Sequence, residues 1–343
     1  MDQPKIAVFA LGGTIATQPG RSAGLVPTLT GEDLVATVPE LAALATLDVT
    51  SFRQLPGPDL GFADIEALAV AIEKAASDGA DGVVVTQGTD TIEETAFVLD
   101  HIVASDIPVV VTGAMRSPVA PGADGPANLL AAVRVAASPA ARGLGALVVF
   151  DDDIHAARFV TKAHTSKPSA FRSRPAGPLG LVVEQRVRIL TQVNRTPPIR
   201  LSAAPQGRRI ALVTMGLDDD GALIELAAGQ GYAGIVIEGY GGGHVSGAAA
   251  QVVGRVARNI PVVIASRTGN GEVLGRTYGY PGSEIDLGER GAIRAGWLDG
   301  IKARILLTLL LRHEAKDIAR HFAMWGGGAT GSAARPPERR PAR

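Results

Sequence analysis

The stretch VVVTQGTDTIEETAFVLD, residues 83–100, decides the fold of this 343-residue chain. Its three opening valines predict a buried strand, and the residues from Ile92 to Leu99 predict a helix. Thr89 and Asp90 therefore stand where a strand passes into a helix. In open α/β sheets, ligands bind in the crevice at that end of the strands. The stretch predicts an α/β sheet and a functional site at its edge.

Apolar runs of the same kind recur along the chain, with helical patterns between them such as the one over 128–137. They lie at 6–10, 109–112, 147–150, 210–214, 234–239 and 262–266. Continuous apolar strands that alternate with helices are typical of a parallel sheet covered by helices on both faces. The chain is therefore predicted to be an α/β protein.

A polar segment with three prolines, residues 191–208, interrupts this pattern and predicts a linker. It separates a larger N-terminal domain, residues 1–190, from a smaller C-terminal one, residues 209–325. We expect a mostly parallel sheet flanked by helices in the first and a flavodoxin-like α/β arrangement in the second. The end of the chain, 326–343, is of low complexity, with four arginines and one glutamate. It predicts a disordered basic tail, with a basic docking segment as the alternative.

Composition and charge narrow the class of protein. Hydrophobic residues make up 46% of the chain and charged residues 20%, which suits a soluble globular protein. The net charge of −1 does not indicate a basic surface that would bind nucleic acid. No apolar run is long enough to span a bilayer. The first residues lack the apolar segment of a secretory signal, so we expect a cytoplasmic protein, with a processed secreted form as the alternative. With no cysteine, disulfides and Cys-bound zinc are excluded.

Three groups of residues are candidates for chemistry. Thr14 follows two glycines after the first strand and can face the same crevice, unless it only bonds its own backbone. Thr89 and Asp90 stand near a helix start, which favours a negative ligand group, although both also suit helix capping. Lys162 can accept a proton if burial lowers its pKa, but an ordinary solvated lysine is the favoured interpretation.

Other patterns are weaker. The glycine-rich segments 238–247 and 267–284 lack the glycine spacing of a dinucleotide-binding loop. The acidic triplets 151–153 and 218–220 are more typical of solvated turns than of a magnesium site.

Several of these segments match a known family. The segments ALGGTIAT (10–17), 83–100, TGAMRSPVAPGADGPANL (112–129) and VTKAHTSKPSAFRS (160–173) follow in its order. The chain resembles a bacterial-type L-asparaginase of the asparaginase/glutaminase superfamily, and the similarity spans roughly residues 4–325.

The resemblance implies hydrolysis of the side-chain amide of asparagine to aspartate and ammonia, without a metal or organic cofactor. Thr14 corresponds to the nucleophile. Thr89, Asp90 and Lys162 correspond to a second group, in which the lysine and the aspartate polarise Thr89. A desolvated Lys162 would serve as a base, whereas pairing with Asp90 would hold it charged, and both possibilities stay open.

The resemblance also implies a substrate-binding set, some of it supplied by a neighbouring copy. Gly57 and Asp59 belong to the stretch that grips the substrate, and Asp59 takes the α-amino group. Gly88 adjoins the backbone donors for the developing oxyanion. Glu284 of a neighbouring copy would bind the amino group, and His244 stands where many relatives have asparagine. A homodimer or homotetramer with shared sites is therefore expected.

Two positions depart from the family pattern. The loop 18–34 has no tyrosine, although relatives place one there to assist the nucleophile, and Tyr278 or Tyr280 is a candidate substitute. The substrate-gripping stretch reads Gly57-Pro58-Asp59 in place of serine-glutamine-aspartate. Loss of two polar groups weakens binding by about 1–3 kcal/mol each, so we expect a weaker or differently selective enzyme.

Three alternatives are kept at this stage. The first is an inactive or weak relative that binds an amino acid, and the second is a glutaminase-asparaginase of relaxed specificity. The third is the amidase subunit of a tRNA-dependent amidotransferase, which the near-neutral net charge does not favour.

Overall fold

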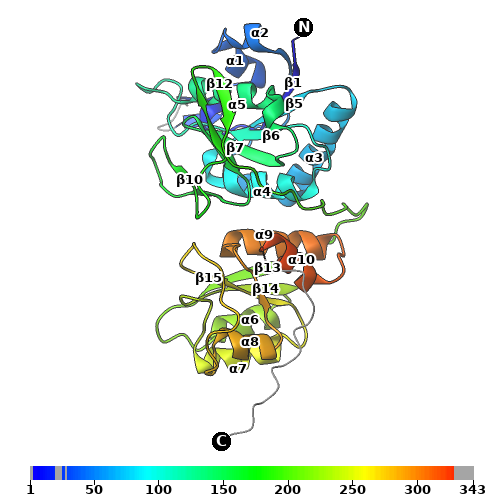
Figure 1. Cartoon of the computed structure of the whole chain (residues 1–343), viewed down its shortest axis with the longest axis vertical. Coiled ribbons are helices and arrows are strands. Elements are labelled where there is room, and N and C mark those ends of the chain that lie inside the picture. Colours follow the sequence, from blue (N-terminus) through cyan, green and yellow to red (C-terminus); the bar gives the residue numbers. More distant parts are fainter. Residues whose placement is uncertain (1–2, 20–24, 28, 328–343) are drawn as a thin grey trace, which may run out of the picture. The chain divides into compact units, whose positions relative to one another are not determined.

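The computed structural model describes residues 3–19, 25–27 and 29–327. The chain divides between Ala203 and Ala204 into two compact units, unit 1 and unit 2 (Figure 1). This division falls inside the segment that was interpreted as a linker. The predicted tail lies outside the described residues from 328 onward, as do residues 20–24 and 28 of the loop without a tyrosine.

Unit 1 is built on one mixed sheet. Its eight strands lie in the order β12-β11-β8-β7-β6-β5-β1-β4. Five neighbours are parallel: β4 (Thr46–Ser51), β1 (Lys5–Ala10), β5 (Gly82–Thr86), β6 (Val109–Thr112) and β7 (Ala146–Phe150). Three more pair antiparallel: β8 (Asp153–Ala156), β11 (Gly180–Val183) and β12 (Arg186–Ile189). The strands predicted in this region are confirmed.

The antiparallel edge was not predicted from the apolar runs. Two pairs of residues at positive φ, Asp151-Asp152 and Glu184-Gln185, make the two-residue turns that join β7 to β8 and β11 to β12. Such turns suit the twist of a hairpin. The acidic triplet 151–153 therefore begins with a turn, as interpreted, and ends in a strand.

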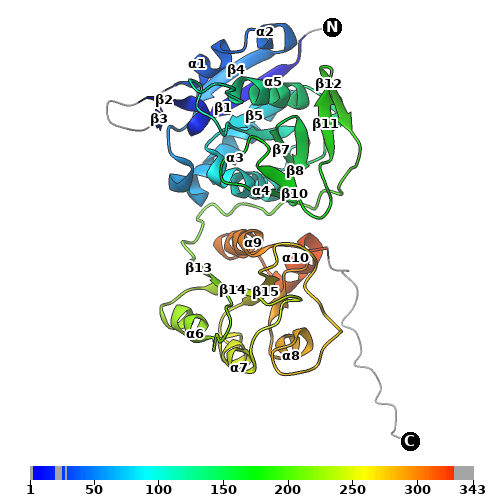
Figure 2. The same ribbon diagram turned by 90° about the vertical axis from the view of Figure 1, so that its left-hand side faces the viewer.

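Helices cover both faces of this sheet (Figure 2). They are α1 (Gly31–Ala36), α2 (Leu41–Leu44), α3 (Phe62–Ser77), α4 (Ile92–Ile102) and α5 (Gly125–Ala136). On one face, Leu129 and Val133 of α5 share a buried cluster with Val84 and Val110 of the sheet. The helix predicted over 128–137 begins three residues earlier, because a proline at position 126 fits the first turn of a helix.

Short elements complete unit 1. They are the strands β2 (Thr17–Pro19), β3 (Leu25–Pro27), β9 (Val160–Lys162) and β10 (Phe171–Ser173), and the 3-10 turns η1 (Thr14–Ala16), η2 (Gly57–Asp59), η3 (Thr89–Thr91) and η4 (Pro139–Ala141).

The strand order contains a reversal at β1. The chain passes from β1 to β4 on one side and later returns to β5 on the other side. At such a point the connections leave the sheet in opposite directions and open a crevice beyond the strand ends. The segments that follow β1, β4 and β5 are therefore the ones expected to line a ligand site.

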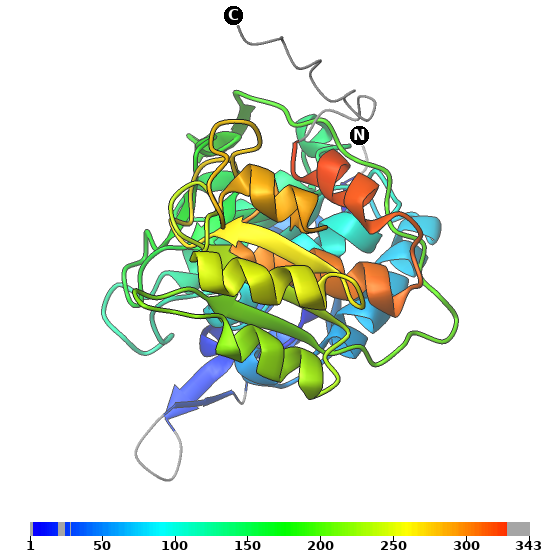
Figure 3. The same ribbon diagram turned by 90° about the horizontal axis from the view of Figure 1, so that it is seen from below.

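Unit 2 is a smaller parallel α/β layer structure. Its strands lie in chain order: β13 (Ile210–Thr214), β14 (Gly234–Gly239), β15 (Val262–Ser266) and β16 (Ile293–Arg294). Its helices are α6 (Ala222–Gly229), α7 (Gly247–Val256), α8 (Glu284–Glu289), α9 (Gly300–Arg312) and α10 (Ile318–Trp325). Figure 3 looks onto the sheet face that α6 and α7 cover, and α9 covers the other face (Figure 1). The three strands predicted in this unit are confirmed.

Among the helices of the described residues, none is long and apolar enough to cross a membrane.

Candidate active site

The turn after β1 touches the turn after β5. Gly12 and Gly13 have φ of +102° and +83°, a conformation that glycine adopts most easily. A Cβ added at Gly13 would lie 2.0 Å from the backbone nitrogen of Gly88, so the two backbones are in direct contact. Half-buried Thr14 and buried Thr89 each follow one of these glycines. The segments of the two predicted threonines therefore lie side by side.

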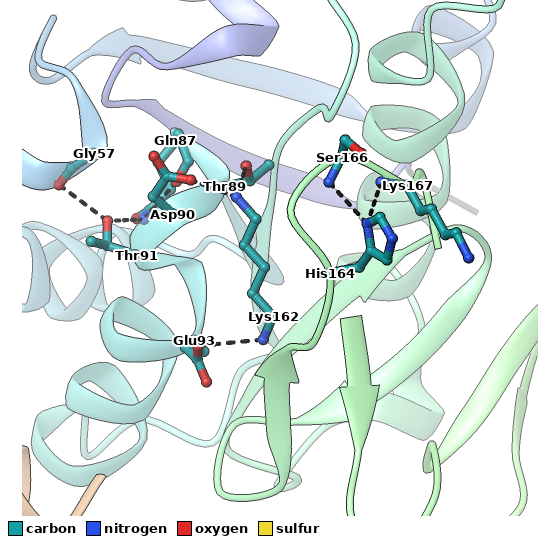
Figure 4. A network of polar contacts seen from close by, with 11 residues as sticks. Gly57, Gln87, Thr89, Asp90, Thr91, Glu93, Lys162, His164, Ser166 and Lys167 are labelled. Carbon is teal, nitrogen blue, oxygen red and sulfur yellow. Dashed lines mark hydrogen bonds and ion pairs between the residues drawn. The ribbon is translucent and has the colours of Figure 1, made fainter. Parts of the chain in front are cut away.

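The turn after β4 is tied to the same place. The Thr91 hydroxyl donates to the carbonyl of Gly57 at 3.1 Å, and the Gln87 side-chain amide donates to the Thr91 oxygen at 3.2 Å (Figure 4). A Cβ at Gly88 would be 3.1 Å from the backbone nitrogen of Gly57. This Gln87–Thr91–Gly57 link fixes η2, and with it the exposed Asp59, against η3.

Lys162 joins this group from β9, more than 70 residues further along the chain. Its ammonium nitrogen lies 2.9 Å from the Thr89 hydroxyl oxygen and 2.5 Å from a carboxylate oxygen of Asp90 (Figure 4). The lysine side chain is 13% exposed and that of Asp90 is 66% exposed. This is the contact of an ammonium with a carboxylate, and the same ammonium polarises the hydroxyl. Thr89, Asp90 and Lys162 therefore form one hydrogen-bonded group, in which the lysine is not a solvated surface residue.

Glu93 holds the strand that carries the lysine. Its buried carboxylate, in the first turn of α4, accepts a hydrogen bond of 3.3 Å from the backbone nitrogen of Lys162. Beyond the lysine, the ring of His164 accepts from the backbone nitrogens of Ser166 and Lys167 and so closes the next turn (Figure 4). The backbone of β9 is thus fixed at the position from which the lysine reaches the threonine.

Glu284 and His244, the remaining predicted residues, meet in unit 2. Glu284 opens α8 with a side chain of 0% exposure, and one oxygen accepts from the backbone nitrogens of Thr277 and Tyr278 at 2.6 and 2.7 Å. Its other oxygen lies 3.0 Å from Nε2 of His244. Burial raises the pKa of Glu284, but the backbone donors and His244 outweigh it and bring that pKa below its usual value. A contact of Glu284 with a substrate amino group stays a prediction.

Two glycines allow the loops of unit 2 to approach closely enough for this contact. A Cβ at Gly243 would lie 2.7 Å from a methyl group of Val273, and one at Gly282 would lie 2.2 Å from the carbonyl oxygen of Val245. Both glycines have positive φ. The glycine-rich segments therefore serve loop packing around His244 and Glu284. Within the part of the chain that the structure describes, no three His, Cys, Asp or Glu side chains form a group that could hold a metal ion.

Sequence models of one protein family match both parts of the chain. The model described as "Asparaginase, N-terminal" covers residues 5–195, and "Glutaminase/Asparaginase C-terminal domain" covers residues 209–322. The chain belongs to the asparaginase family. The resemblance stated from the sequence is therefore confirmed. The first family model ends inside the polar proline-containing segment, and the second begins directly after it.

Relatives of the family match over nearly their whole length. A probable L-asparaginase of Deinococcus radiodurans is 38% identical over 328 residues, 93% of this chain and 97% of that protein. An L-asparaginase of Bacillus licheniformis is 35% identical over 320 residues, 93% and 98% of the two chains. A crystal structure of a probable cytoplasmic L-asparaginase from Campylobacter jejuni matches with a TM-score of 0.83 at 29% identity, covering 94% of this chain and 99% of that one. A relative from Haemophilus influenzae, 32% identical over 335 residues, 94% and 93% of the two chains, is named as a probable periplasmic L-asparaginase.

Three residues of the asparaginase fold contribute to this site beyond those singled out from the sequence. Gln87 and Thr91 tie η2 to η3, and Glu93 anchors β9. All three lie within the stretch 83–100. The signal was the density of polar residues at one strand end, since a simple turn needs fewer of them.

Proposed function

We propose that the protein is an L-asparaginase, which hydrolyses the side-chain amide of L-asparagine to L-aspartate and ammonia with Thr14 as the nucleophile. As a member of the asparaginase family the protein is an amidohydrolase. One observation supports the assignment of substrate and nucleophile. The Lys162–Thr89–Asp90 group and the backbone contact of Gly13 with Gly88 both lie at the reversal point of the sheet. That is the place where an open α/β sheet binds its ligand.

The chemistry follows from the groups present. An amide is a poor electrophile, so its cleavage needs an activated hydroxyl and donors for the developing oxyanion. The Thr14 oxygen attacks the amide carbon, ammonia leaves, and water then releases aspartate from the ester. In this proposal Thr89, polarised by Lys162 and Asp90, orients the water and moves its proton. Backbone N–H groups beside Gly13 and Gly88 are the candidate oxyanion donors.

Substrate recognition is assigned to the turn around Gly57. Asp59 is exposed on η2 and takes the α-amino group, while Gly57 and Gly88 let the substrate lie against the backbone. A second candidate function is a glutaminase-asparaginase of relaxed specificity. It is favoured by the Gly57-Pro58-Asp59 turn, which offers few side-chain donors to discriminate between the two amides.

Assembly and location are part of the same proposal. His244 and Glu284 of a neighbouring copy complete the site, so the active form is a homodimer or homotetramer. The protein acts in the cytoplasm, which the name of the Campylobacter jejuni relative supports.

Ammonia release from asparagine and from glutamine tests the assignment. We expect Thr14→Ala and Lys162→Met to lower kcat by at least about 100-fold, because each removes a group that acts on the reacting atoms. Lys167→Met is the matched control, since Lys167 lies in the same segment, is exposed and donates only its backbone nitrogen to His164.

The melting temperatures of the three variants separate a lost reaction from a lost fold. Near-normal turnover in Thr14→Ala would refute the nucleophile assignment, and near-normal turnover in Lys162→Met would remove the lysine from the mechanism. A wild-type protein that binds asparagine without releasing ammonia would be an amino-acid-binding relative instead.

A further inference from the structure

The turn that follows β6, residues 113–116, lies against the turn that carries Thr89. A Cβ added at Gly113 would be 2.5 Å from the carbonyl oxygen of Gln87 and 3.5 Å from Cγ2 of Thr89, so the two turns are in direct contact. The β6 turn belongs to the segment 112–129, which contains none of the candidate site residues. Its position nevertheless bears directly on that of Thr89.

Two side chains at the start of α5 hold this turn in place. The carboxylate of Asp124 accepts hydrogen bonds from the backbone nitrogens of Met115 and Arg116 at 3.0 and 2.9 Å. The side-chain amide of Asn128 donates to the carbonyl of Gly113 at 3.0 Å and to the Asp124 carboxylate at 3.2 Å. Backbone groups at both ends of the β6 turn are thus bound by one linked pair of side chains, Asp124 and Asn128, which we call the α5 clamp.

Both residues of the α5 clamp are used against their local preference. Asp124 is the N-cap residue of α5, where an aspartate ordinarily accepts from the first N–H groups of its own helix, but its side chain makes no such bond. Asn128 lies inside the helix, where asparagine is unfavourable, and it is 3% exposed. Its oxygen accepts from the backbone nitrogen of Asp151 at 3.1 Å. The stability of α5 alone would favour other residues at both positions, so we infer that the clamp serves the turn.

The same helix start also touches the turn of the other threonine. A Cβ at Gly125 would lie 3.1 Å from Cγ1 of Ile15, the residue after Thr14, and 3.4 Å from the Cβ of Ala114 in the β6 turn. The first turn of α5 is therefore in contact with η1 and with the β6 turn at once.

We propose that Asp124 and Asn128 are positioning residues for the amide hydrolysis. The α5 clamp fixes the β6 turn, and this turn keeps Thr89 within hydrogen-bond distance of Lys162. This inference rests on the proposed function. The clamp acts on a turn that carries a reacting group and leaves the turn of Asp59 alone, so its loss should lower kcat and change KM little. A displacement of about 1 Å at a reacting group costs about 100-fold in rate.

The substitution Asn128→Asp makes the clamp dependent on pH. It keeps the shape of the side chain but puts a second carboxylate where the amide nitrogen lies 3.2 Å from the carboxylate of Asp124. Two buried carboxylates at this distance do not both ionise readily, so the pair keeps one proton to a higher pH than isolated carboxyl groups do. That proton restores one donated hydrogen bond, and its loss leaves the Gly113 carbonyl facing a negative charge. The other charged residues that contact the pair, Arg116 and Asp151, do so through their backbone nitrogens.

The measurement is the kcat of Asn128→Asp for ammonia release from asparagine, divided by the wild-type kcat at the same pH. We expect this ratio to fall by at least about tenfold from about pH 5.5 to about pH 8.5, with KM within about threefold of wild type. Asn259→Asp is the matched control, because it introduces the same charge at an exposed asparagine of unit 2. Its ratio should stay constant over this range.

A purely structural role predicts a different result. The melting temperature of Asn128→Asp would then fall with rising pH, while the kcat ratio of the folded protein would not change. A constant ratio, in a wild-type background that releases ammonia, would overturn the α5 clamp and leave the proposed function standing. A wild-type protein that releases no ammonia from asparagine or glutamine would overturn both.

Asp124→Asn decides the question if Asn128→Asp does not fold. The asparagine adds no charge, but its one oxygen cannot accept from Met115 and Arg116 as two carboxylate oxygens do. We expect its kcat to fall by at least about tenfold at nearly unchanged KM, because the β6 turn loses one of its anchors. A kcat equal to that of the wild type would refute the positioning role.

Discussion

Replacement of Gly13 by alanine is the most direct test of how the site is assembled. The position combines two obstacles to a side chain: a φ of +83° and a Cβ that would lie 2.0 Å from the nitrogen and 2.2 Å from the Cα of Gly88. Ordinary contact begins near 3.4 Å. The two turns must therefore separate by about 1.4 Å, the difference between 3.4 and 2.0 Å.

The two obstacles have separate consequences. A non-glycine residue at positive φ costs about 1–2 kcal/mol, which lowers stability without moving the site. A displacement of about 1 Å between reacting groups costs about 100-fold in rate. We therefore expect Gly13→Ala to lower kcat/KM for asparagine by at least about 100-fold, in addition to a loss of stability.

Gly143→Ala separates the two effects. Gly143 has a φ of +75°, and a Cβ there would meet no atom within 4 Å. This variant should lose about 1–2 kcal/mol, or roughly 2–8 °C in melting temperature, with a rate within about twofold of wild type. Steady-state ammonia release and thermal unfolding measure both quantities. If Gly13→Ala kept half of the wild-type rate and melted no lower than Gly143→Ala, the contact between the turns would not be what positions the threonines.

Two further predictions concern assembly and pH. If sites are shared between copies, an equimolar mixture of the Thr14→Ala and Glu284→Gln variants, dissociated and reassociated, should regain about a quarter of the wild-type rate. Half of the dimers then contain one copy of each variant, and one of the two sites in such a dimer is intact. No recovery would show that each site lies within one copy. Burial, helped by the positive charge of Arg172, lowers the pKa of His155 to about 4 from 6.5, so stability is complete above pH 6.5 and falls towards pH 4 as the unfolded chain takes up the proton. The pKa difference of about 2.5 units corresponds to a loss of about 3 kcal/mol in the free energy of unfolding between pH 6.5 and pH 4. The free energy of unfolding of His155→Gln should lack that part of the pH dependence. Equal slopes of this free energy against pH in the variant and in wild type would contradict the prediction.

Apolar runs located the central parallel strands because their positions are set by burial on both faces. Every residue of β5, β6 and β7 is buried, so these strands read as continuous apolar segments. The edge strands gave no such signal. β12 alternates exposed and half-buried residues, including Arg186 and Arg188, because one face and one edge of it meet solvent. Its pairing depends on the turn at Glu184-Gln185, which composition alone does not reveal.

The candidate site was predictable at the end of β5, where several polar residues follow one strand directly. The turn around Thr89 follows from local sequence, because a strand and a helix meet there. The arrival of Lys162 was not predictable from local sequence, since its ion pair with Asp90 spans 72 residues and depends on the path of β9. The burial of Glu284 was also not predictable from local sequence. It depends on the conformation of a loop, which brings the backbone N–H groups of Thr277 and Tyr278 to the carboxylate.

The Gln87–Thr91–Gly57 link has a consequence for engineering. Because one hydroxyl ties the turn that we propose binds the substrate to the turn that carries Thr89, the proposed function implies that selectivity and rate are not independently adjustable in this scaffold. A substitution that widens the Gly57 turn for a longer amide would displace Thr91, whose hydroxyl binds the Gly57 carbonyl. It would thereby also displace Thr89, two residues earlier. We expect libraries that randomise residues 57–59 alone to yield variants that accept more substrates but turn over more slowly. Libraries that also vary positions 87 and 91 should yield variants that keep the rate of turnover.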